Sequence, residues 1–497
     1  MLDMASLGMK NPTPLFPGFH LPTLHRKPQS AQQKLIEKRA KIKQKSLSQL
    51  GDFLGKFIPL QSLDPEDFGE NSRRRIYSKE NTFWGFFSQV LDADGGCQEV
   101  VRKIQAFAAM KSQLPPSSST SAYCQARKKL NLSDLKDVLL GASKWLQSQG
   151  EPKCFYGRRV IVVDGTGLSM PDTPENQAVW PQQKNQKPGC GFPQASLCGC
   201  FCLQTGSLLS YELGNKKSHE LPMLRKQWET FKAGDIFLGD KGFCSYFDVS
   251  SFKDRGVDSV ITLARRLPAS ETTCFKVLGQ DDLLIHWTKP KHTKKTSYSR
   301  TDWERLPEQL RLRQIKVTVN RPGFRSTEFY IITTLLDADK YPASDIADLY
   351  FQRWDVELYF RDIKTTMGMD ILRCKTPDMV RKEITMHLIV YNCLRCLISE
   401  AAAKHHVDAK RVSFKGSLQA LRQWEPNLNH GKETRLERLR LIDLLYEAVA
   451  GVIVPKRPGR REPRAVKRRP KPFQLLTRPR HEMKETEHRG RKYAKAA

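Results

Sequence analysis

The spacing of apolar residues changes twice along the chain, and each stretch predicts a different kind of secondary structure. Between residues 53 and 148, apolar side chains recur every three or four positions, which is the spacing of amphipathic helices. From residue 158 they gather in short runs bounded by glycine and proline, which is typical of buried strands. Beyond residue 347 the helical spacing returns. We therefore expect an α/β protein with helical regions at both ends of a central β-sheet region.

The N-terminal region is predicted to be helical. Residues 1–27 are rich in proline and are expected to form a flexible leader, whereas residues 28–150 are expected to be helical and to bind DNA. Asn81 is the expected N-cap of the first clear helix, and the basic run 127–129 is expected to be exposed on a short helix. The longer helices are expected at residues 81–91, 97–110 and 133–148. A helical lid with solvated lysines is the alternative interpretation.

In the central region, a carboxylate directly follows each of two apolar strands. The run 160–163 ends in Asp164 and a Gly-Thr-Gly turn, and the run 236–238 is followed by Asp240 after one glycine. Further strands are expected at 195–204, 207–214 and 259–266, and helices at 221–231 and around 252. The resulting order, β-β-β-α-β-α-β, is that of the ribonuclease-H-like fold, a mixed sheet flanked by helices. This core is expected to comprise residues 158–264 and 335–375.

Residues 265–334 form a predicted β-rich insertion between the fifth strand of this core and the helix that follows. Strand-like runs occupy residues 282–287, 313–320 and 327–336. Trp287 and Trp303 are candidates for stacking on an exposed DNA base, with packing inside the insertion as the alternative. Beyond the core, residues 376–454 are expected to be a helical C-terminal region.

Charge points to a polyanionic partner. The chain has 83 Lys and Arg against 53 Asp and Glu, a formal net charge of +30. Residues 455–497 contain 16 Lys or Arg and four Glu, and are expected to be a disordered basic tail that contacts phosphates, with a solubilising extension as the alternative. The sequence lacks an apolar run of about 20 residues and a signal peptide pattern, so we expect no membrane contact, and a cytoplasmic protein associated with the nucleoid.

The 12 cysteines are expected to be reduced thiols. Cys198, Cys200 and Cys202 alternate, so in a strand they would share one face as small buried residues. Cys393 and Cys396 have the spacing of a zinc-binding pair, but no second pair accompanies them. We therefore do not expect a structural zinc ion.

Residues 347–370 are predicted to be helical and carry the most informative polar pattern. At about 100° per residue, Tyr350, Arg353, Glu357 and Lys364 project within roughly 60° of one another. The apolar side chains beside this stripe are expected to hold the helix against the core; they are Phe351, Trp354 and Leu358. A solvated face of charge pairs is the alternative interpretation.

The spacing Tyr-(2)-Arg-(3)-Glu-(6)-Lys resembles the motif of the insertion sequence "four" family of bacterial DDE transposases, which move DNA by cut and paste. The sequences VDGTGLSMPDTPEN around Asp164 and LGDKGFCSY around Asp240 are similar to two further blocks of that family, in the same order. The resemblance implies that Asp164, Asp240 and Glu357 are catalytic residues and metal ligands. It also implies that Tyr350, Arg353 and Lys364 contact DNA phosphates, and Lys241 is expected to assist them.

Other acidic residues compete for these roles. Asp172 and Glu175 follow a proline in a loop, where turn and capping functions explain them equally well. Asp355 and Asp362 point away from Glu357 on an ideal helix. His219 and Glu220 could touch substrate, although a polar helix start is the simpler interpretation.

Three converging carboxylates offer hard oxygen ligands that suit two Mg²⁺ ions, with Mn²⁺ as a possible substitute. Two such ions about 4 Å apart can activate a water or a 3′-hydroxyl for displacement at phosphorus. The expected partners are double-stranded DNA, both the element's terminal inverted repeats and target DNA, and a second copy of the chain in the DNA complex. A metal-dependent structure-specific nuclease of the same fold and a catalytically inactive DNA-binding descendant are the alternative functions.

Overall fold

The computed structural model describes residues 50–64, 76–110, 114–149, 155–215, 219–263, 265–292, 298–319, 327–428, 434–455, 476–479 and 482–483. The expected leader 1–27, the basic stretch 28–49 and all but a few residues of the expected tail 455–497 lie outside the described residues. Within the described part, no helix has both the length and the apolar character needed to cross a bilayer.

The described N-terminal elements are helical, as the apolar spacing predicts. They comprise α2 (Leu50–Leu54), the 3₁₀ turns Gly55–Phe57 and Leu60–Leu63, α3 (Lys79–Leu91), α4 (Cys97–Met110), α5 (Ser121–Lys129) and α6 (Leu132–Ser148). Helix α3 begins earlier than expected, because the Ser78 hydroxyl, and not Asn81, caps it by accepting a hydrogen bond from the Asn81 amide at 3.2 Å.

The expectation that Arg127 is exposed is wrong. Its side chain is buried, donates a hydrogen bond to Gln89 Oε1 at 2.8 Å, and lies over the rings of Phe86 and Tyr123. Stacking of this kind lets a guanidinium enter an aromatic core without losing its charge. Lys128 and Lys129 beside it are exposed, as expected.

A nine-stranded mixed sheet forms the centre of the molecule, in the order β3-β2-β1-β4-β5-β9-β8-β7-β6. Its first five strands are β1 (Val160–Ser169), β2 (Gln194–Cys202), β3 (Leu208–Asn215), β4 (Ile236–Gly239) and β5 (Asp258–Leu263). Strand β1 is antiparallel to β2 and parallel to β4, and β4 is parallel to β5. This is the order and direction of a ribonuclease-H-like core, as the sequence predicts.

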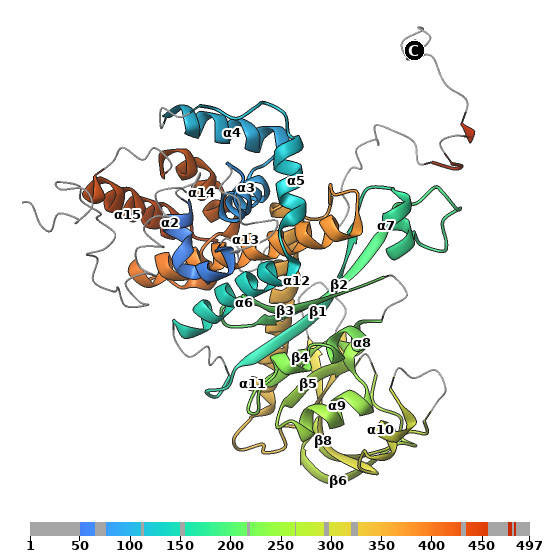
Figure 1. The fold of residues 1–497 in the computed structure, drawn as a ribbon. Helices are drawn as coiled ribbons and strands as arrows, with labels where there is room; N and C mark the ends of the chain where they lie inside the picture. Colours follow the sequence, from blue (N-terminus) through green and yellow to red (C-terminus); the bar gives the residue numbers. More distant parts are fainter. Residues whose placement is uncertain are drawn as a thin grey trace, which may run out of the picture.

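Helices cover both faces of this sheet (Figure 1). Val160 and Val162 face the cluster that contains α6, α12 (Asp355–Arg361) and α13 (Pro377–Lys404). Ile161 and Val163 face the opposite cluster, which contains residues of α8 (Glu220–Arg225) and α9 (Tyr246–Asp254). Successive side chains of β1 therefore enter two different cores, which explains why this strand is apolar at every position.

The cysteines follow the same alternation. Cys198, Cys200 and Cys202 are all fully buried on the α8 and α9 side of the sheet, and they are free thiols, as expected. The remaining short elements between the strands are α7 (Pro174–Val179), at the tip of the β1–β2 hairpin, and the 3₁₀ turns Trp228–Thr230 and Lys241–Phe243.

The insertion continues the core sheet instead of forming a separate one. Its elements are β6 (Thr272–Gly279), β7 (Asp282–Thr288), α10 (Arg300–Glu304), β8 (Gln309–Val319) and β9 (Thr327–Thr333). Strand β9 pairs with β5 through Val260 and Thr333, so hydrogen bonds run unbroken from core to insertion. Arg313 of β8 is buried and makes a double contact with Asp282 of β7, at 2.8 and 2.5 Å.

Trp287 and Trp303 both lie in the core of the insertion, 5% and 6% exposed, where their rings pack against Tyr246 of α9. The hypothesis that they stack on an exposed DNA base is therefore wrong in this structure. Packing inside the insertion, the alternative interpretation, describes both of them.

Residues 343–366 form a helical rod with two irregular turns. Helix α11 (Ala343–Phe351) passes through a 3₁₀ turn (Gln352–Trp354) into α12, and α12 ends in a π-helical turn (Asp362–Thr366). A single regular helix, as expected from the sequence, is thus wrong in detail. Because the 3₁₀ turn is wound more tightly and the π turn more loosely, side chains on either side of them change direction.

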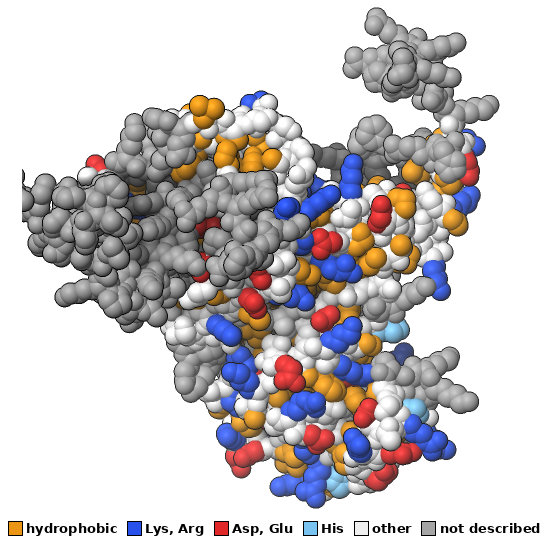
Figure 2. All heavy atoms as spheres, viewed as in Figure 1, with side chains coloured by type: hydrophobic (Ala, Val, Ile, Leu, Met, Phe, Trp, Pro, Cys, Tyr) orange, Lys and Arg blue, Asp and Glu red, His pale blue; other side chains and the backbone are white. Residues whose placement is uncertain are grey.

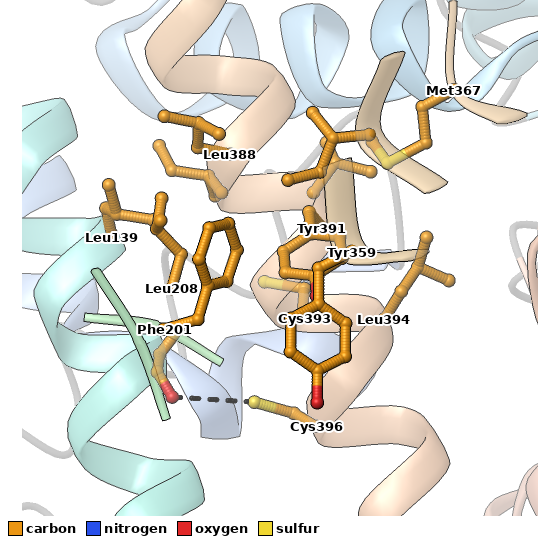
Figure 3. Packing of buried hydrophobic residues seen from close by; sticks show 14 of the residues in the cluster. Leu139, Phe201, Leu208, Tyr359, Met367, Leu388, Tyr391, Cys393, Leu394 and Cys396 are labelled. Carbon is orange, nitrogen blue, oxygen red and sulfur yellow. Dashed lines mark hydrogen bonds between the residues drawn. The ribbon is translucent and has the colours of Figure 1, made fainter. Parts of the chain in front are cut away.

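Helix α13 is the central packing element of the other half of the molecule. It contacts α3, α6, α14 (Phe414–Leu428) and α15 (Arg435–Gly451), so the N- and C-terminal helices share one core (Figure 1). Figure 3 shows its buried face: Tyr391 and Cys393 lie near Phe201 of β2, and the Cys396 thiol points to the Ala142 carbonyl at 3.6 Å. The Cys393–Cys396 pair is therefore buried among packed side chains, as expected.

Candidate active site

Two carboxylates lie at the same level on neighbouring strands. Val162 of β1 pairs with Leu238 of the parallel strand β4. Two residues further along each strand come Asp164 and Asp240, so the register places both at the edge where β4 ends. The expected turn after Asp164 is wrong, because β1 continues to Ser169 by pairing with the longer strand β2. Asp164 is thus held inside a ladder, which fixes its backbone.

Each of these aspartates is oriented by a short local hydrogen bond. Asp164 Oδ1 accepts from the Gly165 amide at 2.7 Å, and Asp240 Oδ1 accepts from the Gly242 amide at 2.8 Å. Burial raises the pKa of Asp164 above its usual range; the charges of Asp240 and Glu357 raise it further, while the Gly165 amide and Arg353 oppose the rise. The three acids therefore interact electrostatically, which requires them to be close together.

Glu357 reaches this edge from α12, a helix that packs on β1. Its carboxylate is 38% exposed and accepts a hydrogen bond from Arg353 Nη2 at 3.2 Å. Arg353 comes from the 3₁₀ turn one helical turn earlier, and its side chain is 14% exposed. Arg353 thus interacts with both Glu357 and Asp164, and it comes from the irregular turn.

Two further residues of the predicted polar stripe form hydrogen bonds with threonines of the sheet. The Tyr350 and Thr262 hydroxyls are 2.9 Å apart, and Lys364 Nζ donates to Thr166 Oγ1 at 3.0 Å. The structure thus brings Tyr350, Arg353 and Lys364 to the same side of the rod as Glu357. The predicted site does not include Thr166 or Thr262. Thr166 could have been identified, because it comes two residues after Asp164 and residues two apart in a strand lie on the same face of the sheet.

A pocket of about 760 Å³ opens beside the acids. Its lining residues are Lys241, Thr262, Leu263, Phe329, Tyr350, Phe351, Arg353 and Trp354. The side chains of Phe351 and Trp354 are 45% and 59% exposed, so the expectation that they hold the helix against the core is wrong. Lys241 is exposed at the start of the turn after Asp240. Cations and aromatic rings therefore meet on one open surface, and Figure 2 shows further Lys and Arg side chains spread over the visible face of the protein.

The competing acids point elsewhere. Asp362 is buried and contacts Arg395 of α13 at 3.3 Å, and Asp355 lies 3.6 Å from Lys410. Asp172 is exposed on the β1–β2 hairpin and accepts a hydrogen bond from Gln177 at 2.7 Å. These partners explain the three carboxylates without a role at the sheet edge.

Comparison with known proteins identifies the chain. Residues 155–393 match the sequence model of the family described as "Transposase DDE domain". Over 433 residues the chain is 27% identical to the transposase InsG for insertion sequence element IS4 from Escherichia coli K12, covering 85% of this chain and 92% of InsG. These two matches support an IS4-family DDE transposase. The chain is therefore a DNA transposase, an enzyme that acts on DNA.

Shorter stretches resemble other transposases. The chain is 36% identical over 59 residues to the putative transposase InsL for insertion sequence element IS186A from Escherichia coli K12, covering 12% of this chain and 16% of InsL. It is 32% identical over 84 residues to the probable transposase for IS5377 from Geobacillus stearothermophilus, covering 17% and 22%. A solved piggyBac transposase synaptic complex with hairpin DNA aligns over 83% of this chain and 85% of that one, at 10% identity and a TM-score of 0.38.

DDE transposases use divalent metal ions. As their side chains stand, no three Asp, Glu, His or Cys residues in the described part of this transposase are arranged to hold one. At the sheet edge, the Glu357 carboxylate accepts a hydrogen bond from Arg353. The chemistry of the donors nevertheless fits, because Asp164 and Asp240 each use one oxygen in a local hydrogen bond and keep the other without a partner among the described residues.

Proposed function

We propose that this DDE transposase binds the ends of its own insertion sequence, cuts them, and joins the 3′ ends to target DNA by a cut-and-paste route. The observation that supports this proposal best is the register of β1 and β4. It sets Asp164 and Asp240 side by side, and α12 brings Glu357 to the same edge. A carboxylate set of this kind, beside a cationic pocket, suits phosphoryl transfer on a polyanion.

In this proposal Asp164, Asp240 and Glu357 are the catalytic residues and hold two Mg²⁺ ions, or Mn²⁺ in their place. Bound divalent ions supply Lewis-acid activation of the attacking oxygen and stabilise the leaving oxygen. In the first step, water attacks phosphorus and the 3′-oxygen of the element leaves as a hydroxyl. In the second step, that 3′-hydroxyl attacks a target phosphodiester, and a target 3′-hydroxyl leaves. One P–O bond forms and one breaks each time.

Three of the four residues proposed to contact DNA line the pocket, namely Lys241, Tyr350 and Arg353, and the fourth, Lys364, contacts Thr166 of β1. Arg353 presents a planar guanidinium that can grip two phosphate oxygens, and Tyr350 and Lys364 are oriented by their threonine partners. Lys241 is the least constrained of the four because its side chain is exposed. The open ring of Trp354 offers a stacking surface for a base in the same pocket.

The remaining regions are proposed to hold the DNA away from the cut. The helical region 28–150 and the basic tail 455–497 supply sequence-independent phosphate contact, and the insertion 265–334 holds DNA near the scissile bond. A homodimer on paired ends would allow both ends to be cut together. Because the substrate is DNA, the cytoplasm, on the nucleoid, is the proposed site of action.

The test uses purified protein, a labelled duplex that carries the element's own end, and either Mg²⁺ or EDTA. We expect Mg²⁺-dependent nicking at the end, followed by hairpin or joined products. Nicking without any joined product would support the structure-specific nuclease instead. Binding without cutting in Mg²⁺ and in Mn²⁺ would support the inactive descendant. Sizing of the protein–DNA complex by light scattering tests the homodimer independently.

A further inference from the structure

The π-helical turn Asp362–Thr366 carries Lys364, one of the residues proposed to contact DNA. Its defining hydrogen bond runs from the Met367 amide to the Asp362 carbonyl at 3.0 Å, so donor and acceptor are five residues apart instead of four. Turns of this kind are rare inside helices and are frequently found at functional sites. A specific contact is therefore expected to hold this turn in place.

An ion pair in the helical core anchors the first residue of the turn. The Asp362 carboxylate accepts a hydrogen bond from Arg395 Nη2 of α13 at 3.3 Å, and the two side chains are only 10% and 11% exposed. The exposed Arg361 lies further from the same carboxylate, at 3.8 Å. A buried ion pair is weak evidence for stability, because desolvation of the two charges offsets their attraction. Its clear effect here is on geometry, since it directs Asp362 toward α13.

Arg395 is itself held from several sides. Its Nε donates a hydrogen bond to the Tyr391 hydroxyl at 3.2 Å, and its guanidinium lies over the rings of Tyr359 and Tyr391, at 5.1 and 5.3 Å. Figure 3 shows both tyrosines in the buried core. Their hydroxyls donate to the backbone carbonyls of Leu203 and Gly206, at 3.2 and 2.6 Å, in the turn between β2 and β3. The anchor of the π turn is therefore connected both to α13 and to the catalytic sheet.

Lys364 lies on the other side of the same turn. At about 100° per residue, side chains two positions apart in a helical turn point in nearly opposite directions. With Asp362 directed toward α13, Lys364 is directed toward β1, where its Nζ donates to Thr166 Oγ1 at 3.0 Å. Thr166 comes two residues after Asp164 and lies on the same face of β1. An ammonium has three N–H donors, so two stay available for phosphate oxygens beside Asp164.

We propose that Asp362, through its ion pair with Arg395, is a positioning residue that fixes the π turn and thereby directs Lys364 to the DNA phosphate next to Asp164. Thr166 holds the lysine at its other end. This inference rests on the proposed function, because it takes Lys364 as a phosphate contact. It gives a role to a carboxylate that does not itself reach the acidic edge, since regular winding after Asp362 would change the direction of Lys364.

The experiment measures DNA binding in EDTA, so it does not depend on cleavage. Full-length wild type, Lys364→Ala, Asp362→Asn and the double variant are titrated with a duplex that carries the element's own end, at several salt concentrations. Loss of one phosphate contact lowers the slope of log K against log salt concentration by about 0.9. We expect Lys364→Ala and Asp362→Asn each to lose about this much, and the double variant to lose no more than Lys364→Ala alone.

Asp248→Asn is the matched control, because it removes the same charge from another buried pair of aspartate and arginine. Asp248 of α9 accepts hydrogen bonds from Nε and Nη2 of Arg225, both at 2.7 Å, on the opposite side of the sheet from α12. Its melting temperature should fall, because a buried pair is broken. Its salt slope should nevertheless equal that of wild type, which separates a loss of stability from a loss of positioning.

Two variants of Thr166 keep the inference testable even if Asp362→Asn folds poorly. Thr166 is partly exposed, so Thr166→Val removes the hydroxyl without opening the core and should lose the same slope of about 0.9. Thr166→Ser keeps the hydroxyl and should bind as wild type does. A wild-type slope for both Asp362→Asn and Thr166→Val would overturn the proposal, and so would a loss in the double variant beyond that of Lys364→Ala. If Lys364→Ala itself keeps the wild-type slope, the lysine contact and this inference fail together, while Mg²⁺-dependent cleavage by wild type would leave the proposed function standing.

Discussion

Replacement of Glu357 by glutamine should separate catalysis from stability. Glu357 is 38% exposed, and the partner described for its carboxylate is Arg353, one helical turn away at 3.2 Å. Exposed pairs with this spacing contribute about 0.3–0.5 kcal/mol. Gln keeps the shape and one hydrogen-bond acceptor, so the melting temperature should fall by no more than about 2 °C.

The effect on cleavage should be far larger. A metal ion contributes several kcal/mol of transition-state stabilisation, so losing about 4 kcal/mol through one missing ligand slows cleavage roughly 1000-fold. Binding to the element's end should persist, because Glu357→Gln removes no positive charge and frees Arg353 from its acidic partner. Binding is measured by gel shift in EDTA, and cleavage by single-turnover assay in Mg²⁺.

Asp355→Asn is the matched control for this variant. Asp355 lies on the same helix, two residues before Glu357, but its carboxylate points toward Lys410 at 3.6 Å. It should cleave at the wild-type rate. The reasoning is refuted if Glu357→Gln cuts as fast as wild type, or if it loses stability and cleavage together while Asp355→Asn does the same.

Three further outcomes follow from charge and burial. Removal of the tail 455–497 should weaken DNA binding and flatten its dependence on salt by about 0.9 per lost phosphate contact. An unchanged slope in a salt titration would show that the tail does not touch DNA. Because its ring is exposed, Trp354→Ala should leave urea unfolding nearly unchanged but weaken binding to a DNA end with an unpaired base by about 1–3 kcal/mol. The buried Trp303 is the contrast, and Trp303→Ala should lower the free energy of unfolding by about 3–5 kcal/mol. Equal DNA binding by wild type and Trp354→Ala would show that this ring does not contact DNA. The pKa of Asp164 is raised in the folded state, so its ionised form destabilises the metal-free fold at neutral pH, and this destabilisation disappears as pH falls through the raised pKa. Asp164→Asn should therefore melt at a higher temperature than wild type in EDTA at pH 7. Melting curves that show the reverse would contradict the assignment.

The strands of the core were predictable because their signal is local. Apolar runs bounded by glycine place β1, β2, β3 and β4 within a few residues of their observed positions. The end of β1 was not predictable from the sequence. Gly165 and Gly167 have the pattern of a turn, whereas their pairing with β2 depends on residues about 30 positions further along the chain. The continuation of the sheet into the insertion depends in the same way on the pairing of β5 with β9.

The sequence predicted which polar residues share one face of the helical rod 343–366, but not what surrounds them. A regular helix puts Tyr350, Arg353 and Glu357 on one face, and they do meet at the sheet edge. The same regular helix puts Trp354 against the core, whereas the structure exposes it as the last residue of a 3₁₀ turn. Helical periodicity cannot reveal such a turn, because its cause is packing against the sheet.

Whether an aromatic or acidic side chain is buried could not be read from its neighbours in the sequence. Trp303 and Trp354 both stand beside charged residues, yet one is buried and the other open. Glu220 reads as a helix start, and its place next to Gly165 appears once β3 has carried the chain back to the acidic edge. Long-range topology decides both cases.

The position of α13 late in the chain has a consequence for synthesis. This helix fills the core between the catalytic sheet and the N-terminal helices, with most of its residues buried. A growing chain therefore exposes the apolar faces of α3, α6 and β2 until residue 404 has left the ribosome, and such faces are prone to aggregation and proteolysis. A transposase cut short before that point would lack the core that joins its halves. Formation of this shared core is thus tied to translation through residue 404.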